Sequence, residues 1–279
     1  MYKKYKVNSS YFDTIDTESK AYWLGFICSD GNIVNHRNAK NGKIKKEYRL
    51  KIAIDEGDLE HLEKLKIDIG SNHKISFETK KNQQKRIASL SIWDKNIVSK
   101  LVNMGLENNK TFSLKPILLN NKLERHFWRG MIDGDGHIEP INNKSRQSQI
   151  SLSGNKLMTN KFLSFIIENK IETKSKPFKD KSIYRMSFCG NYIAKKVGIL
   201  LYGKSTIFLN RKKDTIDELL LYVPQQEKRE SITEEKIINA INKSKNYKEA
   251  AKFLNIGYTT LWRYMKNKNM PNFNKLKHG

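Results

Sequence analysis

The spacing of hydrophobic residues predicts helices and strands that follow one another in a regular order. In residues 48–55, Leu50, Ile52 and Ile54 alternate with polar or small residues, which is the two-residue period of a strand with one covered face. Residues 58–67 instead place leucines at the spacing of a helix. The predicted elements of this first part are a helix at 19–29, strands at 32–35 and 48–55, a helix at 58–67, strands at 74–78 and 86–93, and a helix at 94–104.

The same order of elements returns in the second part of the chain. The segment Lys-Ile-Ala-Ile-Asp at 51–55 matches Gln-Ile-Ser-Leu-Ser at 149–153. The sequence therefore predicts an α+β fold of two αββαββα repeats, at residues 1–113 and 114–223, related by a pseudo-twofold axis and each with an antiparallel sheet. The predicted elements of the second repeat are a helix at 123–134, strands at 137–141 and 148–153, a helix at 157–169, strands at 173–178 and 183–189, and a helix at 192–201.

The C-terminal part has a different pattern. Residues 224–230 predict a linker, and an amphipathic helix follows it. Ala250 and Ala251 allow two short helices to cross closely, and Asn255 lies at the turn, where asparagine accepts the left-handed conformation. Residues 231–279 therefore predict a small all-α helix-turn-helix domain that binds DNA. Its candidate DNA contacts are Tyr258, Thr259, Thr260 and Arg263.

The charge balance indicates a polyanionic partner. The chain has 53 Lys and Arg residues against 29 Asp and Glu residues, a formal net charge of +24. Because the basic residues recur through most of the sequence, we expect the folded surface itself to attract nucleic acid. We expect no signal peptide and no contact with a membrane, since no apolar stretch has the length of a membrane span. Cys28 and Cys189 are expected to be buried free thiols, which suits a reducing cytoplasm of a bacterial, phage or organellar host.

Two similar segments end helices in the two repeats. They read Trp-Leu-Gly-Phe-Ile-Cys-Ser-Asp-Gly at 23–31 and Trp-Arg-Gly-Met-Ile-Asp-Gly-Asp-Gly at 128–136. Each segment has small residues four apart, so the two helix backbones can approach closely and bring Asp30 and Asp135 side by side. One Asp-Gly after a helix is usually only a helix stop, but two copies in a duplicated basic chain favour a metal site. Neighbouring carboxylates repel unless a cation lies between them, and Mg²⁺ with oxygen ligands is the usual ion beside phosphates.

The strands offer a second surface. Helices would cover their apolar face, and the two polar faces side by side would form a basic saddle over the metal site. Arginine and lysine suit guanine edges and phosphates, and glutamine suits adenine. The predicted DNA contacts on this surface are Arg49, Lys51, Lys85, Arg86, Arg146, Gln147, Gln149, Lys181 and Arg185.

Over residues 15–222 the chain resembles the LAGLIDADG homing endonucleases of the single-chain, two-motif type. The resemblance implies a monomeric enzyme that cuts both strands of a long asymmetric DNA site across the minor groove. It implies that Asp30 and Asp135 bind Mg²⁺, with Mn²⁺ as a substitute, and that the carbonyl groups of Ser29 and Gly134 are further ligands.

The resemblance also implies a lysine near the metals after the last helix of each repeat. Lys110 fits this place in the first repeat. In the second repeat Lys204 aligns best and Lys212 competes with it. Asp55 and Ser153, each at the end of the second strand of its repeat, are expected to order water molecules.

The first motif departs from the family pattern. Cys28 stands where the motif has its first acid, whereas Asp133 keeps that acid in the second copy. We expect this first acid to cap the helix, so that activity survives its loss. Two other functions stay open: an RNA-splicing maturase that binds its host intron RNA, and a non-catalytic DNA-binding regulator of the same fold. The helix-turn-helix favours the regulator, and the two retained acids at Asp30 and Asp135 argue against it.

Overall fold

The structure is a computed structural model that describes residues 5–38, 44–79, 86–107, 113–141, 147–223 and 231–278. The chain divides into two compact units, Met1–Leu221 and Tyr222–Gly279. The predicted linker at 224–230 and three predicted site residues, Lys85, Lys110 and Arg146, lie outside the described residues.

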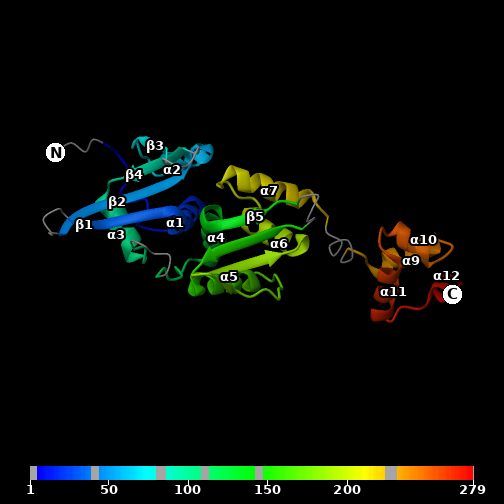
Figure 1. The fold of residues 1–279 in the computed structure, drawn as a ribbon. Helices are drawn as coiled ribbons and strands as arrows, with labels where there is room; N and C mark the ends of the chain where they lie inside the picture. The colour runs from blue at the N-terminus through cyan, green and yellow to red at the C-terminus, as the bar shows by residue number, and fades with distance from the viewer. Residues whose placement is uncertain are drawn as a thin grey trace. The chain divides into compact units, whose positions relative to one another are not determined.

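The first unit contains the predicted αββαββα order twice, which confirms the predicted fold class (Figure 1). The elements of the first repeat are α1 (Glu18–Asp30), β1 (Gly31–Asn38), β2 (Ile44–Asp55), a short 3₁₀ helix (Glu56–Asp58), α2 (Leu59–Asp68), β3 (Ile75–Thr79), β4 (Arg86–Ile92) and α3 (Lys95–Asn103). Those of the second are α4 (Asn121–Asp135), β5 (Gly136–Glu139), β6 (Gln149–Gly154), α5 (Lys156–Glu168), β7 (Phe178–Asp180), β8 (Ile183–Cys189) and α6 (Asn191–Tyr202).

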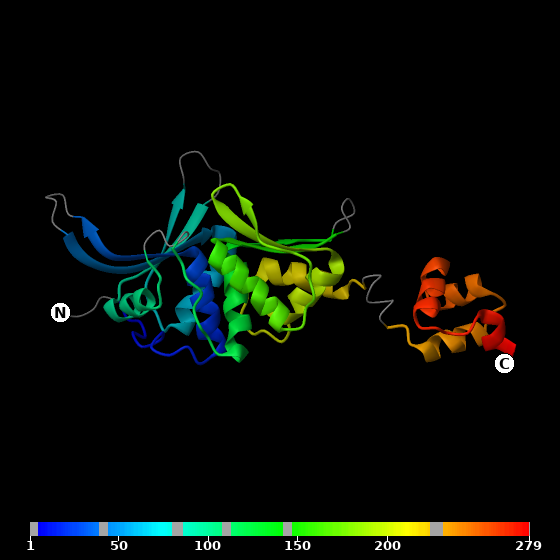
Figure 2. The ribbon, with the colours of Figure 1, turned by 90° about the horizontal axis from the view of Figure 1, so that it is seen from below.

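Each repeat folds around a four-stranded antiparallel sheet. The strand orders are β1-β2-β4-β3 and β5-β6-β8-β7, so the two sheets have the same topology. Alternate residues of the central strands, such as Leu50, Ile52, Ile150 and Leu152, are buried under the helices. Figure 2 shows the helices gathered on one side of both sheets, while the opposite faces, which we call the open faces, carry no helix within the described residues.

Two departures from the predicted elements have physical reasons. Strand β7 begins only at Phe178, whereas the sequence predicted a strand over 173–178. Pro177 lacks a backbone N–H and cannot donate to a sheet ladder, so the strand starts after it. The sequence analysis also missed helix α7 (Asn210–Leu221), although Leu209, Ile216 and Leu219 are buried at helical spacing.

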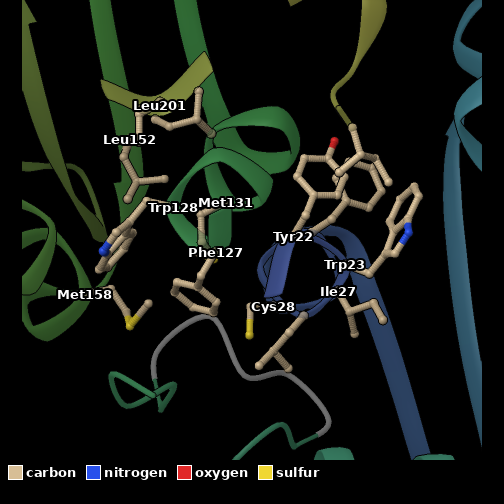
Figure 3. Packing of buried hydrophobic residues seen from close by; sticks show 14 of the residues in the cluster. Tyr22, Trp23, Ile27, Cys28, Phe127, Trp128, Met131, Leu152, Met158 and Leu201 are labelled. Atoms are coloured by element: carbon tan, nitrogen blue, oxygen red, sulfur yellow. The ribbon is translucent and has the colours of Figure 1, made fainter. Parts of the chain in front are cut away.

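Helices α1 and α4 form the centre of the first unit. They pack side by side, and Figure 3 shows Cys28 of α1 and Phe127 of α4 in the same buried cluster. Cys28 is a buried free thiol as predicted, but Cys189 is exposed at the end of β8, because it lies on the open face of its sheet. No helix of the described residues combines the length and the apolar composition needed to cross a membrane.

The second unit is all-helical, and it contains the predicted helix-turn-helix. Ala250, Ala251 and Leu261 are buried where α10 meets α11. Asn255 has a φ of 52° at the turn, as its place in the sequence predicted. The helices of this unit are α9 (Glu234–Asn242), α10 (Tyr247–Phe253), α11 (Tyr258–Asn267) and α12 (Phe273–His278).

Candidate active site and nucleic-acid interface

Two glycines let helices α1 and α4 touch along their backbones. A Cβ atom at Gly25 would overlap the carbonyl oxygen of Phe127, and one at Gly130 would lie 2.7 Å from the backbone nitrogen of Phe26. Both contacts are closer than a Cβ atom can approach another atom. Each helix backbone therefore occupies the space that a side chain on the other helix would need. The predicted close approach of the two motif helices is therefore present.

The same packing brings the ends of the two helices together. A Cβ atom at Gly134 would overlap the Ser29 hydroxyl and lie 3.1 Å from Oδ2 of Asp30. The Asp30 carboxylate therefore lies against α4 at the residue before Asp135. Asp30 is half-buried and Asp135 is exposed. The Asp30 carboxylate of the first repeat thus lies beside the end of α4, along the line where α1 and α4 pack, which we call the seam.

A small pocket of about 190 Å³ opens beside Asp30. Asp55 reaches it from the end of β2, where Oδ1 accepts a hydrogen bond of 2.9 Å from the Gly57 backbone nitrogen. Ser153, the matching residue of the second repeat, does not line this pocket. The lining residues are Phe26, Asp30, Ala53, Ile54, Asp55, Asp58, Asp133, Gly134, Leu209 and Arg211.

The polar lining is mainly carboxylate oxygen, which is the donor type that Mg²⁺ and Mn²⁺ prefer. No cluster of three or more His, Cys, Asp or Glu residues suited to hold a metal ion occurs in the described parts of the chain. A site at Asp30 and Asp135 would therefore need backbone carbonyl groups, water or phosphate oxygens as its other ligands.

Lys212 is the predicted lysine that the structure places at these acids. Its Nζ donates three hydrogen bonds to the carbonyl oxygens of Ile132 (2.6 Å), Asp133 (2.8 Å) and Gly136 (2.7 Å). The ammonium group therefore caps the C-terminal end of α4, where the helix dipole favours a positive charge. Burial, opposed mainly by the charge of Asp133, lowers the pKa of Lys212 to about 8.

The structure does not bring Lys204 together with the acids. The loop that holds it is fixed at the other end of the motif helices, because the Gly203 carbonyl accepts from Arg125 and the Thr206 backbone nitrogen donates to Glu18. With a rise of about 1.5 Å per residue, these anchors lie about 15–18 Å along the helices from Asp135 and Asp30.

Asp133 has a different place from Asp135. It is buried and accepts hydrogen bonds from the hydroxyls of Tyr22 (2.7 Å) and Tyr202 (2.6 Å) and from the Leu209 backbone nitrogen (2.8 Å). Burial raises the pKa of the Asp133 carboxyl, and the two tyrosine hydroxyls oppose this. Asp133 thus ties α1, α4, α6 and the start of α7 together.

Helix α7 also reaches across to the first repeat. Asn210 accepts from Lys64 and donates to Glu60, both at 2.7 Å, which links α7 to α2. Arg211 donates through Nε to both carboxylate oxygens of Asp58, at 3.2 and 3.0 Å, and its side chain keeps 60% of its exposure. Arg211, which the sequence analysis did not single out, is therefore a cation that lines the acidic pocket.

His61 lies behind the pocket, buried against α1. Because the Tyr22 hydroxyl donates to Asp133, its oxygen accepts from His61 Nε2 at 2.9 Å, and Nδ1 is buried without a hydrogen-bond partner in the described structure. Burial, helped by the charges of Lys64, Arg211 and Lys212, lowers the pKa of His61 to about 3.

The low pKa of His61 predicts a loss of stability in mild acid. A folded-state pKa below the ordinary 6.5 means that the unfolded chain binds the proton more tightly, so stability is full above pH 6.5 and is lost as the pH falls toward 3. Between pH 7.5 and pH 5 wild type should lose about 2 kcal/mol more than His61→Gln in denaturant unfolding. The exposed His137→Gln should keep the wild-type slope, and equal slopes for all three proteins would contradict the prediction.

The open faces carry most, but not all, of the predicted basic contacts. Arg49 and Lys51 lie on the open face of the first sheet, on the strand positions that alternate with Leu50 and Ile52. The prediction for Arg86 was wrong. It alternates with Ala88 and Leu90, so it belongs to the helix-covered side, where it pairs with Glu56 at 2.8 Å.

The second sheet and the helix-turn-helix present further predicted contacts. Gln149 and Arg185 lie on the open face, Gln147 is exposed just before β6, and Lys181 is exposed in the β7–β8 turn with a φ of 56°. In the C-terminal unit the predicted contacts Tyr258, Thr259 and Arg263 are exposed and Thr260 is half-buried. Trp262, which was not among the predicted contacts, is 46% exposed on α11, and Lys266 Nζ lies 5.1 Å from the centroid of its ring.

Comparison with known proteins gave matches of two kinds. Residues 228–267 match the family model of bacterial regulatory proteins of the Fis family. No curated protein sequence matches the chain. The similar solved structures include the homing endonuclease I-DmoI, with 17% identity over 71% of this chain and 98% of that chain and a TM-score of 0.46. They also include the LAGLIDADG meganuclease I-AabMI bound to uncleaved DNA (11% identity, 71% and 88% coverage, TM-score 0.47) and the meganuclease I-SmaMI bound to uncleaveable DNA (14%, 89% and 97%, 0.49). These three proteins are homing endonucleases or meganucleases, and I-AabMI is a LAGLIDADG protein.

Proposed function

We propose that the chain is a site-specific DNA endonuclease that hydrolyses phosphodiester bonds in both strands of a long duplex. The observation that supports the proposal is the close approach of the Asp30 carboxylate to α4 at Gly134, the residue before Asp135. To cut both strands, the protein needs metal-binding carboxylates placed beside each of the two phosphodiester bonds that are cleaved. A duplicated chain provides that symmetry within one molecule, so we expect a monomer.

The residues at the seam suit a divalent metal. Asp30 and Asp135 would hold Mg²⁺ or Mn²⁺, and the carbonyl groups of Ser29 and Gly134 are the proposed further ligands. The bound metal would supply an activated water and charge stabilisation at the leaving oxygen. Asp55 lines the same pocket and would orient water there, as its position in the sequence suggested. Ser153 does not line the pocket and lies opposite Arg185 on the open face of the second sheet. Lys212, whose ammonium is committed to three carbonyl groups, would act by fixing the end of α4.

The DNA would lie on the open faces, with the helix-turn-helix adding contacts through α11. The net charge of +24 predicts that affinity falls steeply with salt, because bound phosphates release their counterions. Lys51, Gln149 and Arg185 are among the proposed contacts, and Tyr258 and Arg263 are those of α11.

The experiment that tests the function is a cleavage assay with the intronless form of the host gene on a plasmid. Wild type should linearise this plasmid with Mg²⁺ or Mn²⁺ and leave it intact with EDTA. A plasmid with the intron in place is the matched control, since insertion would split the recognition site. Intact intronless plasmid in the presence of metal would contradict the proposal.

Arg211 should matter for the rate of cleavage more than for binding. Its Nε holds Asp58, so its terminal nitrogens can face a phosphate at the pocket. Arg211→Met should lower the single-turnover rate about 10²-fold, since removal of one charge-stabilising donor has effects of that size. DNA affinity without metal should change little. Lys213→Met removes a positive charge from the next position of α7, where the lysine pairs with Asp217, and should keep the wild-type rate. A normal rate in Arg211→Met would contradict this role.

A non-catalytic DNA-binding regulator is the second candidate. It is favoured by the match of residues 228–267 to a regulatory-protein family and by the helix-turn-helix itself. The same assay separates the two functions, because a regulator would bind duplex DNA tightly in a band-shift experiment and never cut it. Preferential binding of intron RNA over duplex DNA would instead support the maturase.

A further inference from the structure

The open faces hold carboxylates beside their cations. Asp180 Oδ2 lies 3.0 Å from Arg185 Nη2, and Glu78 Oε1 lies 3.8 Å from Lys51 Nζ. A carboxylate on a surface that docks DNA is repelled by phosphate and loses its hydration. It is tolerated only where the DNA offers a hydrogen-bond donor, and the exposed amino groups of the major groove belong to cytosine and adenine. An acid in this position would favour some DNA sequences over others.

Asp180 and Arg185 form the better-defined pair. In the β7–β8 ladder Phe178 is opposite Arg185 and Asp180 is opposite Ile183, so both charged side chains lie on the open face. Met186 and Phe188 alternate with them and are buried on the other face. The Arg185 side chain remains 39% exposed and the Asp180 side chain 33% exposed. The pair is thus held in place by the hairpin and stays accessible from the side that would face DNA.

The contact leaves part of Arg185 available. Asp180 meets Nη2, while Nε of Arg185 is buried without a hydrogen-bond partner in the described structure. An acceptor supplied by a bound base would allow the guanidinium to turn and use the rest of its donor fork. Arg185 is also opposite Ser153 on the central strand β6, so it lies inside the sheet and away from its rim.

We propose that Asp180 is a specificity-determining residue that reads a C·G base pair together with Arg185. The carboxylate would accept from N4 of cytosine while the guanidinium donates to O6 and N7 of the paired guanine. At an A·T pair the adenine amino group could still donate to the carboxylate, but the two guanine acceptors for Arg185 are missing. Where the base offers no donor the carboxylate is repelled, so its main effect is to weaken binding to unrelated DNA. The inference rests on the DNA-binding part of the proposed function and does not require cleavage.

The test is binding-site selection with the full chain. Duplexes are enriched from a randomised library by wild type, by Asp180→Asn and by Asp217→Asn, without divalent metal. Dissociation constants are then measured for the wild-type consensus and for an unrelated duplex of equal length. Asp180→Asn should bind the unrelated duplex about tenfold more tightly and keep its affinity for the consensus. Its selected sites should lose the preference for C·G at one position.

Asp217→Asn is the matched control, because it removes the same charge from an ion pair on α7, on the helix side of the sheets. Equal tightening by both variants would mean that only net charge matters and would overturn the inference. Weaker binding of the consensus by Asp180→Asn, with the C·G preference kept, would also overturn it. A wild type that selects a consensus and never cuts it would contradict the nuclease function alone. A wild type that selects no consensus would contradict both.

Discussion

Replacement of Asp30 or Asp135 by asparagine should lower DNA cleavage by at least about 10³-fold, because each change removes an anionic ligand from the proposed metal site. The side chain keeps its size, so folding and DNA affinity should stay close to wild type. Single-turnover cleavage of the target plasmid measures the first effect, and band shifts without metal measure the second. Binding of Mn²⁺ in the presence of DNA, followed by its electron paramagnetic resonance signal, should weaken in both variants.

Asp13→Asn serves as the control, since Asp13 lies near α3 and pairs there with Lys100. It should cut DNA and bind Mn²⁺ as wild type does. Cleavage that persists at the wild-type rate in Asp30→Asn or in Asp135→Asn would exclude that residue as a metal ligand of the active site. Normal Mn²⁺ binding with lost cleavage would assign the acid to another step.

Gly130→Ala should strongly lower the stability of the fold. Its Cβ would overlap the Tyr22 carbonyl and lie 2.7 Å from the Phe26 backbone nitrogen, so only a shift of a whole helix makes room. Alanine gains about 1 kcal/mol over glycine inside a helix. Overpacking where only backbone can move costs about 3 kcal/mol, the upper end of the usual range. The net loss of about 2 kcal/mol should appear in urea unfolding, together with slower cleavage because the ends of α1 and α4 shift.

Gly154→Ala is the matched control. A Cβ there would meet only the Met158 Cβ at 3.7 Å, which is ordinary contact, so stability should change by less than about 0.5 kcal/mol. Gly25→Ala should behave like Gly130→Ala, because its Cβ would overlap the Phe127 carbonyl. Wild-type stability in Gly130→Ala would contradict the prediction, because it would mean that α1 and α4 can separate at this position without loss of stability.

The features that repeat along the sequence could be predicted, because each rests on a local period. Alternation in β2 and β6, helical spacing in α1 and α4, and the two Asp-Gly ends gave the order of elements and the meeting of Asp30 with the end of α4. Arg86 was assigned to the open face. Residues two apart in a strand share a face, and Arg86 alternates with the buried Ala88 and Leu90, so this period indicates the other face.

The features that occur once could not be predicted in the same way. Helix α7 has no counterpart among the described residues of the first repeat, so the duplication gave no guide to it, although its buried residues have helical spacing. Lys204 was ranked above Lys212, but Lys212 is the one of the two that lies at the end of α4. The duplication gave no guide here either, because Lys212 belongs to α7. Which lysine approaches Asp135 depends on where α7 packs, and that is a tertiary contact. Asp133 was expected to cap its helix, whereas its carboxylate accepts from Tyr22 and Tyr202, which come from distant helices and leave no local signal.

Helix α7 limits how this protein could be recombined. Its first turn bonds to Asp133 at the end of α4 and to Asp58 and Glu60 at the start of α2, so it belongs structurally to both repeats. A chimera that joins residues 114–223 to a foreign first repeat would leave Asn210 and Arg211 without their acceptors. Engineering of a new DNA site by exchange of halves therefore has to transplant the α2 carboxylates along with the sheet. Changes confined to the open faces avoid this constraint.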